Sequence, residues 1–274
     1  MGKEIFDNII IAVDLDGTFL NDEHKIPKRN LEAIDEFCEG GGLFTIATGR
    51  ATPYTRTIIS GLELSIPAVV YNGGTIYDFK HENVLWRRTL PLTAREYKLD
   101  FYDKFPTLGV EMMCGENIYY ISSNRQLERH SSNIGVPLQK RNVEDIPFEN
   151  LDKMLLIDEI ENTDNLCKYA STLKLDGIHV TRSSPYFFEI LPANSNKGEG
   201  LRKLIDICGF NNHYIVAAGD YNNDIEMMQV ADLAVAVENA QDEVKKHADI
   251  IVCDNNSGAV YDIVEYLKSH PNLK

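Results

Sequence analysis

Short apolar runs, each followed by a polar loop and an amphipathic stretch, recur toward both ends of the chain. Continuous runs rich in β-branched residues are typical of strands buried on both faces of a parallel sheet. Such runs occupy residues 9–13, 43–47, 67–71, 215–218, 233–237 and 250–253. After the first run, Leu31, Ile34 and Phe37 have helical spacing. The pattern predicts an α/β fold in which strand–helix units build one doubly wound, mainly parallel sheet.

The middle of the chain has a different pattern. Between about residues 83 and 187, short strands meet through tight turns, and helical stretches are grouped between them. Strands that meet through hairpins form antiparallel sheets, so this region predicts a separate α+β unit. We therefore expect residues 1–82 and 188–274 to form one discontinuous core, with residues 83–187 as a domain inserted into it.

Composition limits the partners of the protein. With 274 residues, 43% of them hydrophobic, the chain can bury a sizeable core. Its net charge of −15 argues against a nucleic-acid or anionic membrane surface, because both require basic patches. No apolar run approaches the ~20 residues of a membrane span. We therefore expect no nucleic-acid or membrane partner, and a monomer or small homo-oligomer.

The five cysteines are scattered, and no two of them are close in sequence. An odd number of separate thiols is typical of proteins in a reducing compartment. The first residues also lack the basic and apolar regions of a signal peptide. The sequence thus predicts a cytoplasmic location.

Two pairs of acidic residues follow predicted strands. Asp14 and Asp16 come after the first apolar run, and Asp220 and Asp224 come after the run at 215–218. Open parallel sheets bind ligands at the carboxyl ends of their strands. Ionised carboxylates are rarely buried alone, so such groups need a cation, a shared proton or a chemical role. The alternatives are an acidic turn for the first pair and a helix cap at Asp224.

Features suited to an anion follow other strands. Thr48, Gly49 and Arg50 stand between a strand and a helix, where free N–H groups form an anion cradle, or where Thr48 simply caps the helix. Lys197 is predicted to lie in the first turn of a helix, where the helix dipole disfavours a cation. This position is explained if the lysine faces an anion; the alternative is a surface lysine in contact with solvent. Asn72 ends the third strand, either as a turn residue or as a ligand contact.

Together these residues suggest phosphoryl transfer. Crowded carboxylates repel each other unless one is protonated or a hard cation lies among them. Mg²⁺ typically combines one or two carboxylates with a phosphate. The pattern therefore predicts a phosphate held between Mg²⁺ and Lys197, with Asp14 in line to form an aspartyl-phosphate. Asp16 would give a proton to the leaving oxygen and later take one from water.

Four short segments carry this chemistry: Asp-Leu-Asp-Gly-Thr at 14–18, Thr-Gly-Arg at 48–50, Lys-Gly at 197–198 and Gly-Asp-Tyr-Asn-Asn-Asp at 219–224. In this order they resemble the four motifs of the haloacid dehalogenase (HAD) superfamily. The position of the insert resembles that of the Cof-type (subclass IIB) sugar-phosphate phosphatases. The resemblance implies a Rossmann-like core and identifies residues 83–187 as an α+β cap domain.

The resemblance also implies a role for each matching residue. Asp14 would be the nucleophile and a Mg²⁺ ligand, and Asp16 would be the general acid and base, with its backbone carbonyl on the metal. Thr48 and Lys197 would hold the phosphoryl oxygens. Asp220 and Asp224 would belong to the metal site. The residues that would line the substrate site are Gly49, Arg50, Asn72 and Asn223.

The implied function is a Mg²⁺-dependent phosphatase acting on small phosphorylated metabolites, sugar phosphates first. Two alternatives stay open. A phosphomutase would return the phosphate from the same aspartate to a second hydroxyl. A phosphoacceptor signalling protein also groups aspartates, a threonine and a lysine on a doubly wound sheet, but such a domain is far shorter than this chain.

Overall fold

The computed structural model describes residues 5–271 and 273, apart from the side chains of residues 95, 97–99, 133 and 134. The chain divides into two compact units. Unit 1 consists of Met1–Gly49, Ile58–Trp86 and Asn196–Lys274, and unit 2 consists of Arg50–Thr57 and Arg87–Ser195. Within the described residues, no helix has the length and apolar character needed to span a membrane.

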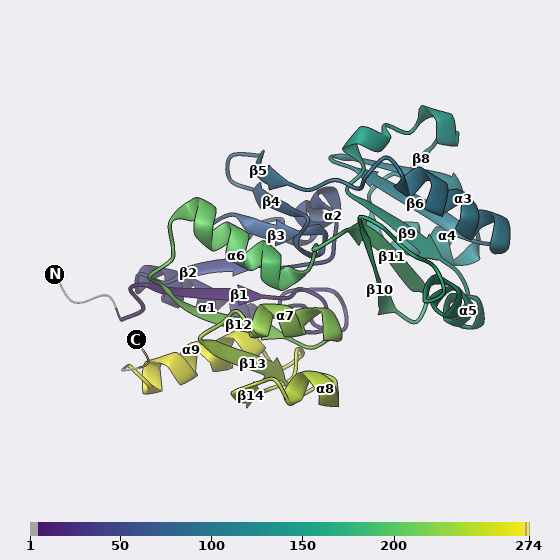
Figure 1. Ribbon diagram of the computed structural model, residues 1–274. Helices are drawn as coiled ribbons and strands as arrows, with labels where there is room; N and C mark the ends of the chain where they lie inside the picture. The colour runs from purple at the N-terminus through teal and green to yellow at the C-terminus, as the bar shows by residue number, and fades with distance from the viewer. Residues whose placement is uncertain (1–4, 272, 274) are drawn as a thin grey trace. The chain divides into compact units, whose positions relative to one another are not determined.

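A five-stranded parallel sheet forms the centre of unit 1 (Figure 1). Its strands are β1 (Ile9–Val13), β2 (Leu43–Ile46), β12 (Tyr214–Gly219), β13 (Leu233–Val237) and β14 (Ile250–Val252). They lie in the order β14-β13-β12-β1-β2, so that Ile11 of β1 pairs with Val216 on one side and Phe44 on the other. The predicted doubly wound, mainly parallel α/β fold is confirmed.

Helices cover both faces of this sheet, because β1 presents apolar side chains in both directions. The helices of unit 1 are α1 (Lys28–Glu39), α6 (Lys197–Cys208), α7 (Ile225–Met228), α8 (Asp242–Lys245) and α9 (Ala259–Ser269). On one face Ile11 belongs to the apolar cluster that includes α1 and α9. On the other face Ile10 belongs to the cluster that includes α6 and α7. These helices bury β1 along its whole length. The chain leaves the sheet at the carboxyl end of this strand.

The third predicted strand has a different partner from the one expected. β3 (Ala68–Val70) forms a separate three-stranded sheet with β4 (Thr75–Asp78) and β5 (Asn83–Arg87). Val69 pairs antiparallel with Ile76, and a parallel bridge to Ala47 connects β3 to the end of β2. A short run of apolar residues predicts a strand but not its neighbour, so the prediction of one continuous parallel sheet was too simple.

Unit 2 is built on a six-stranded sheet in the order β10-β11-β9-β6-β7-β8. Its strands are β6 (Gly109–Cys114), β7 (Asn117–Ser122), β8 (Gln139–Lys140), β9 (Lys153–Ile157), β10 (Ile178–Ser184) and β11 (Phe187–Pro192). Neighbouring strands are antiparallel except for the pair β7 and β8. Helices α3 (Ala94–Lys104), α4 (Arg125–Ile134) and α5 (Ile160–Ala170) complete the unit. This is the α+β pattern expected for the middle of the chain.

Two segments group with unit 2 although the sequence pattern predicted that they belong to the core. β11 extends the unit to Ser195, because it pairs with β9 and β10. The segment Arg50–Thr57, which contains most of helix α2 (Thr52–Ile58), also groups with unit 2. There, Tyr54 Oη donates a hydrogen bond to Glu111 Oε1 at 2.7 Å. The assignment of unit 2 as a cap domain stays a prediction.

Candidate active site

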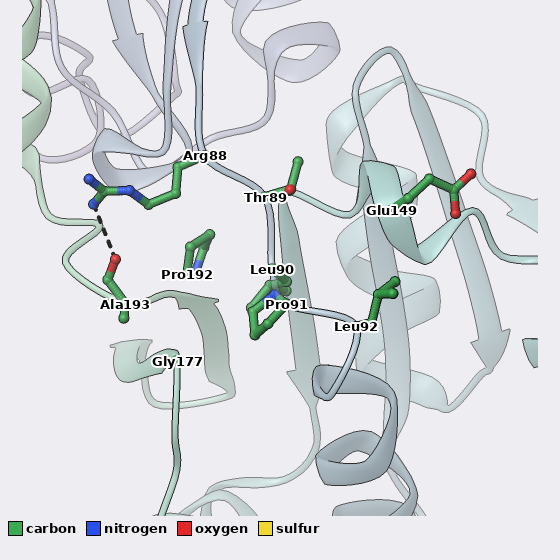
Figure 2. A pocket seen from close by; sticks show the side chains of 9 residues that line it. All are labelled: Arg88, Thr89, Leu90, Pro91, Leu92, Glu149, Gly177, Pro192 and Ala193. Atoms are coloured by element: carbon green, nitrogen blue, oxygen red, sulfur yellow. Dashed lines mark hydrogen bonds between the residues drawn. The ribbon is translucent and has the colours of Figure 1, made fainter.

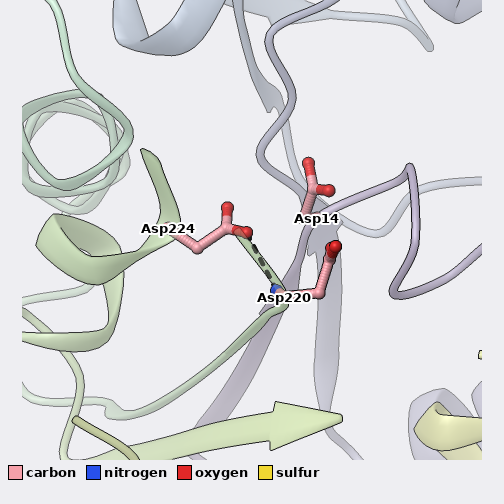
Figure 3. Close-up of side chains that lie close together, drawn as sticks. All are labelled: Asp14, Asp220 and Asp224. Atoms are coloured by element: carbon pink, nitrogen blue, oxygen red, sulfur yellow. Dashed lines mark hydrogen bonds between the residues drawn. The ribbon is translucent and has the colours of Figure 1, made fainter. Parts of the chain in front are cut away.

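Three carboxylates meet at the carboxyl ends of the two central strands. Asp14 directly follows β1, and its backbone N–H donates to the carbonyl oxygen of Ala218 on β12 at 2.9 Å. Asp220 and Asp224 follow β12, and one oxygen from each of the three carboxylates lies within 4.8 Å of the others (Figure 3). The strand-end argument therefore brings these three residues together as the sequence predicted.

The turn after β12 is tight, and its geometry depends on glycine. A Cβ atom at Gly219 would lie 2.3 Å from the Cβ of Asp224. In return, Asp224 Oδ2 accepts hydrogen bonds from the backbone N–H groups of Asp220 and Tyr221, both at 3.0 Å. Asp224 thus holds its own turn together with one oxygen and presents the other to the site.

Lys197 lies in the middle of this cluster. It is the first residue of α6, and its side chain is only 1% exposed. Its Nζ donates to Asp14 Oδ1 and to Asp224 Oδ1, the latter at 2.5 Å. Burial disfavours the ammonium, but the two carboxylates more than offset this and hold the pKa of Lys197 above its usual range. The alternative of a solvated surface lysine is therefore wrong.

Burial and mutual repulsion raise the pKa values of two of these carboxylates. Burial raises the pKa of Asp14 well above its usual range; the charge of Lys197 opposes this shift, and the neighbouring carboxylates add to it. Burial and the nearby Asp224 raise the pKa of Asp220 to about 7, although Thr18 Oγ1 donates a hydrogen bond to it at 2.8 Å. A bound cation would relieve this repulsion, because it stabilises the charged forms.

Asp16 lies outside the group of three carboxylates. Its side chain is 42% exposed, and its Oδ1 lies 3.6 Å from His24 Nδ1. The loop that carries it turns at Gly17, which has φ +80°, and a Cβ there would lie 2.5 Å from Asp220 Oδ2. Asn239, which was not among the predicted site residues, donates to the carbonyl oxygen of Gly17 at 2.7 Å. Its position just after β13, at another strand end, was the signal that could have identified it.

Thr48, Asn72 and Asn223 meet beside the carboxylates in unit 1. The backbone N–H of Asn72 donates to the carbonyl oxygen of Thr48 at 3.0 Å, and Asn223 Nδ2 donates to Asn72 Oδ1 at 3.0 Å. Asn72 has φ +51°, and a Cβ at Gly49 would lie 2.8 Å from its Oδ1. Hydrogen bonds thus connect three predicted site residues from three loops. Because Gly49 has no side chain, the loop of Asn72 can lie close to it.

Arg50 is the predicted site residue that groups with unit 2. It immediately follows Gly49, but its charge acts on His130 of α4. Burial, and then the charge of Arg50, lower the pKa of His130 to about 4. Arg50 therefore belongs to unit 2, whereas the carboxylates belong to unit 1.

A hollow of about 490 Å³ in unit 2 offers no comparable chemistry (Figure 2). Its lining is mostly apolar, and it is formed by Arg88, Thr89, Leu90, Pro91, Leu92, Glu149, Gly177, Pro192 and Ala193. Arg88 Nη1 is engaged by the carbonyl oxygens of Ala193 at 3.1 Å and Asn194 at 2.7 Å. The candidate active site is therefore the cluster at the strand ends of unit 1.

Comparison with known proteins agrees with this site. The sequence model of one protein family, the haloacid dehalogenase-like hydrolases, matches residues 11–264. A 5-amino-6-(5-phospho-D-ribitylamino)uracil phosphatase of Bacillus subtilis is 30% identical, with 94% of this chain and 98% of the relative covered. A pyridoxal phosphate phosphatase of Escherichia coli is 26% identical, with 95% and 98% covered. A haloacid dehalogenase-like hydrolase from Bacteroides thetaiotaomicron has a similar structure, with a TM-score of 0.84, 25% identity, and 95% and 100% covered.

The family match spans both halves of the core and all four motifs. The superfamily inferred from those motifs is thereby confirmed. The relatives from Bacillus subtilis and Escherichia coli are named as phosphatases, which agrees with a site that combines carboxylates, a buried lysine and a threonine-glycine turn. The chain belongs to the haloacid dehalogenase-like hydrolases and is a phosphoric monoester hydrolase.

Proposed function

We propose that this protein is a Mg²⁺-dependent phosphatase that hydrolyses small phosphorylated metabolites, with sugar phosphates first, through an aspartyl-phosphate on Asp14. The observation that carries the proposal is the buried Lys197 between Asp14 and Asp224 at the strand ends. A lysine kept charged and dry at this position would attract a dianionic phosphoryl group.

The residues at the site fit Mg²⁺. Asp14, Asp220 and Asp224 offer hard oxygen ligands close together, and the raised pKa values of Asp14 and Asp220 indicate negative charge without enough compensation. The backbone carbonyl of Asp16 would complete the set. When bound, the ion would neutralise phosphoryl charge and reduce the repulsion between the phosphate and Asp14.

The chain's own residues would then divide the reaction into two displacements. The Asp14 carboxylate attacks phosphorus, and the bond to the leaving oxygen breaks as Asp16 gives that oxygen a proton. Lys197 and Thr48 hold the phosphoryl oxygens, with Gly49, Asn72 and Asn223 lining the site. Asp16 then takes a proton from water, whose oxygen attacks phosphorus, releasing phosphate and restoring Asp14.

The named relatives support small substrates. One acts on a ribityl phosphate attached to a uracil derivative, and the other acts on pyridoxal phosphate. Both substrates are monoesters of small alcohols. We propose a cytoplasmic location, which the five free cysteines support.

The first test measures phosphate release from a panel of sugar phosphates and an aryl phosphate, with Mg²⁺ and with a chelator. We expect release that requires Mg²⁺ and that is abolished in Asp14→Asn, because the amide is a poor nucleophile. Activity near that of the wild type in Asp14→Asn would remove Asp14 from its role. Formation of an isomeric phosphate without free phosphate would instead indicate a phosphomutase.

A further inference from the structure

The loop that carries Asp16 is fixed through its backbone. The side chain of Asp16 is 42% exposed, so packing restrains it little, and the path of the loop determines where its carboxyl group points. The backbone N–H of Phe19 donates to the carbonyl oxygen of Asp14 at 3.2 Å, and that of Leu20 donates to the carbonyl oxygen of Leu15 at 2.8 Å. The carbonyl oxygens of the loop need partners from elsewhere, because buried backbone polar groups are rarely left unpaired.

Three asparagine side chains supply those partners, one for each of three carbonyl oxygens. Asn239 Nδ2 donates to Gly17 at 2.7 Å, Asn30 Nδ2 donates to Phe19 at 3.3 Å, and Asn255 Nδ2 donates to Leu20 at 2.9 Å. Asn30 lies in α1, Asn239 follows β13, and Asn255 follows β14. Three parts of unit 1 that are distant in the sequence therefore hold the loop of Asp16.

Two of these amides also make a second hydrogen bond that fixes their orientation. Asn239 Oδ1 accepts from the backbone N–H of Asn255 at 3.0 Å, and Asn30 Oδ1 accepts from the backbone N–H of Tyr261 at 3.2 Å. A side chain at these positions must donate with one atom and accept with another, which an amide does and a carboxylate does not. The residue type therefore matches the contacts.

Asn239 acts closest to the acid. Gly17 directly follows Asp16 and has φ +80°, so the chain turns sharply at this point. The next residue, Thr18, donates through Oγ1 to Asp220 Oδ1 at 2.8 Å. Asn239 and Asp220 thus hold the turn from the ends of two different strands, β13 and β12. Loss of the Asn239 contact would let the peptide group after Asp16 rotate.

We propose that Asn239, supported by Asn255, is a positioning residue for Asp16: it fixes the turn at Gly17 so that the Asp16 carboxyl group can give its proton to the leaving oxygen. The proposal rests on the phosphatase function proposed above and concerns its first displacement. An alcohol leaves phosphorus readily only with a proton, whereas nitrophenolate leaves without one. A misplaced acid therefore slows the cleavage of alkyl phosphates far more than that of nitrophenyl phosphate.

The test compares kcat/KM of Asn239→Ala and the wild type for a hexose 6-phosphate, phenyl phosphate and p-nitrophenyl phosphate. This quantity includes only the steps up to loss of the alcohol, so the later hydrolysis, which is common to all substrates, does not enter. We expect Asn239→Ala to lower kcat/KM for the hexose phosphate by about tenfold or more. For p-nitrophenyl phosphate the decrease should be less than about twofold, because its leaving group needs no proton.

Phenyl phosphate separates leaving-group chemistry from substrate recognition. It resembles p-nitrophenyl phosphate in shape but has a poorer leaving group, so its kcat/KM should decrease by an intermediate factor in Asn239→Ala. Equal decreases for all three substrates would indicate a merely structural role of Asn239 and would overturn the proposal. No decrease for any of them would overturn it as well.

Asn256→Ala is the matched control, because it removes an exposed asparagine amide from the same region. Asn256 Nδ2 donates to Asp22 Oδ2, and its Oδ1 accepts from the backbone N–H of Asp22, both at 3.1 Å. Neither bond involves the three carbonyl oxygens that hold the loop. We expect Asn256→Ala to leave the order and the ratio of kcat/KM values unchanged. The same dependence on the leaving group in Asn256→Ala would contradict a specific role of Asn239.

A measurement without turnover separates this proposal from the function on which it rests. Amide hydrogen exchange at Phe19 and Leu20 reports how often the loop opens, and we expect Asn239→Ala to accelerate it by about fivefold. Asn256→Ala should leave it near the wild-type rate. Unchanged exchange in Asn239→Ala would overturn the proposal even if the wild type releases phosphate. Faster exchange without phosphate release by the wild type from any substrate would instead contradict the phosphatase function, while confirming that Asn239 holds the loop.

Discussion

Lys197 is the residue on which the charge balance of the site depends. It is buried at the start of α6, where the helix dipole does not favour a cation, and it contacts two carboxylates. Each of those carboxylates is tolerated in the interior because the ammonium lies beside it. The same contact that prepares the lysine for a phosphate therefore also stabilises the fold.

Lys197→Met should lower the free energy of unfolding by about 3 kcal/mol, because it leaves Asp14 and Asp224 buried without their cation. Turnover should also be lost. Asp14→Asn removes one crowded charge instead, so we expect no turnover but unchanged or higher stability. Urea denaturation at neutral pH measures both variants. Equal stability of Lys197→Met and the wild type would show that the lysine does not neutralise the cluster.

Glu111 should give the stability of the protein a distinctive pH dependence. Its pKa is raised from an ordinary value of 4.5 to about 7 by burial. Below the lower value both folded and unfolded chains bind the proton, and this group's contribution is fully present. Between the two values only the folded chain keeps the proton, so stability from this group falls as pH rises and is lost above about pH 7.

The glutamine of Glu111→Gln does not ionise. The stability of this variant relative to the wild type should therefore improve as pH rises from 4.5 to above 7. The change should amount to at most about 3 kcal/mol. Denaturant unfolding of both proteins at several pH values measures this change. The lowered pKa of His130 makes stability rise with pH, but this effect is present in both proteins and largely cancels in the comparison. A difference that stays constant with pH would contradict the raised pKa.

At the scale of elements, the loops at the strand ends are fixed by close backbone approach. Gly73 follows Asn72, has φ +90°, and would place a Cβ only 1.9 Å from the carbonyl oxygen of Asn196. Asn196 is the residue before Lys197, and its side chain caps α6 by accepting from the N–H of Glu199 at 2.8 Å. The asparagine loop and the lysine helix are therefore packed directly on each other.

Gly73→Ala should destabilise the protein by more than about 2 kcal/mol and reduce activity, because it adds a backbone clash to an unfavourable φ. Gly61→Ala is the matched control: φ is +89°, but nothing lies within 4 Å of its Cβ. That variant should lose only about 1 kcal/mol and keep its activity. Thermal unfolding and phosphate release test both; equal losses would mean that the close approach is unimportant.

The elements also show what sequence can predict. Asp14 and Asp220 were expected at one site because strand ends in a parallel sheet share an edge. Lys197 was expected there because it begins a helix against the helix dipole and matches a family motif. The structure brings the three residues together. The partners of β3 and β11 were not predictable, because an apolar run reads the same in either sheet. Likewise, the pairing of Glu111 with His130 depends on the packing of α4 against β6, which no spacing in the sequence encodes.

At the scale of the whole molecule, the effect of salt on the net charge of −15 must be distinguished from the effect of an ion bound at the proposed Mg²⁺ site. Any salt screens the repulsion among surface carboxylates, whereas Mg²⁺ at Asp14, Asp220 and Asp224 would act by binding the folded state alone. The two effects differ in their dependence on concentration and on single residues.

Mg²⁺ at about 100 times its dissociation constant should stabilise the fold by about 2.7 kcal/mol and raise the melting temperature by several degrees. A chelator should reverse the increase. Asp220→Asn should abolish most of it, and sodium chloride at equal ionic strength serves as the control. An identical increase with sodium chloride would attribute the effect to screening and not to a bound ion.

The chain passes between the two units at four places, after Gly49, Thr57, Trp86 and Ser195. Unit 2 therefore cannot be exchanged between relatives as a single continuous segment. A chimera that takes only residues 87–195 from a donor would set the donor's counterpart of Glu111 against a foreign Tyr54. A chimera that preserves this contact must take Arg50–Thr57 together with the insert, although residues 58–86 separate the two segments in the sequence.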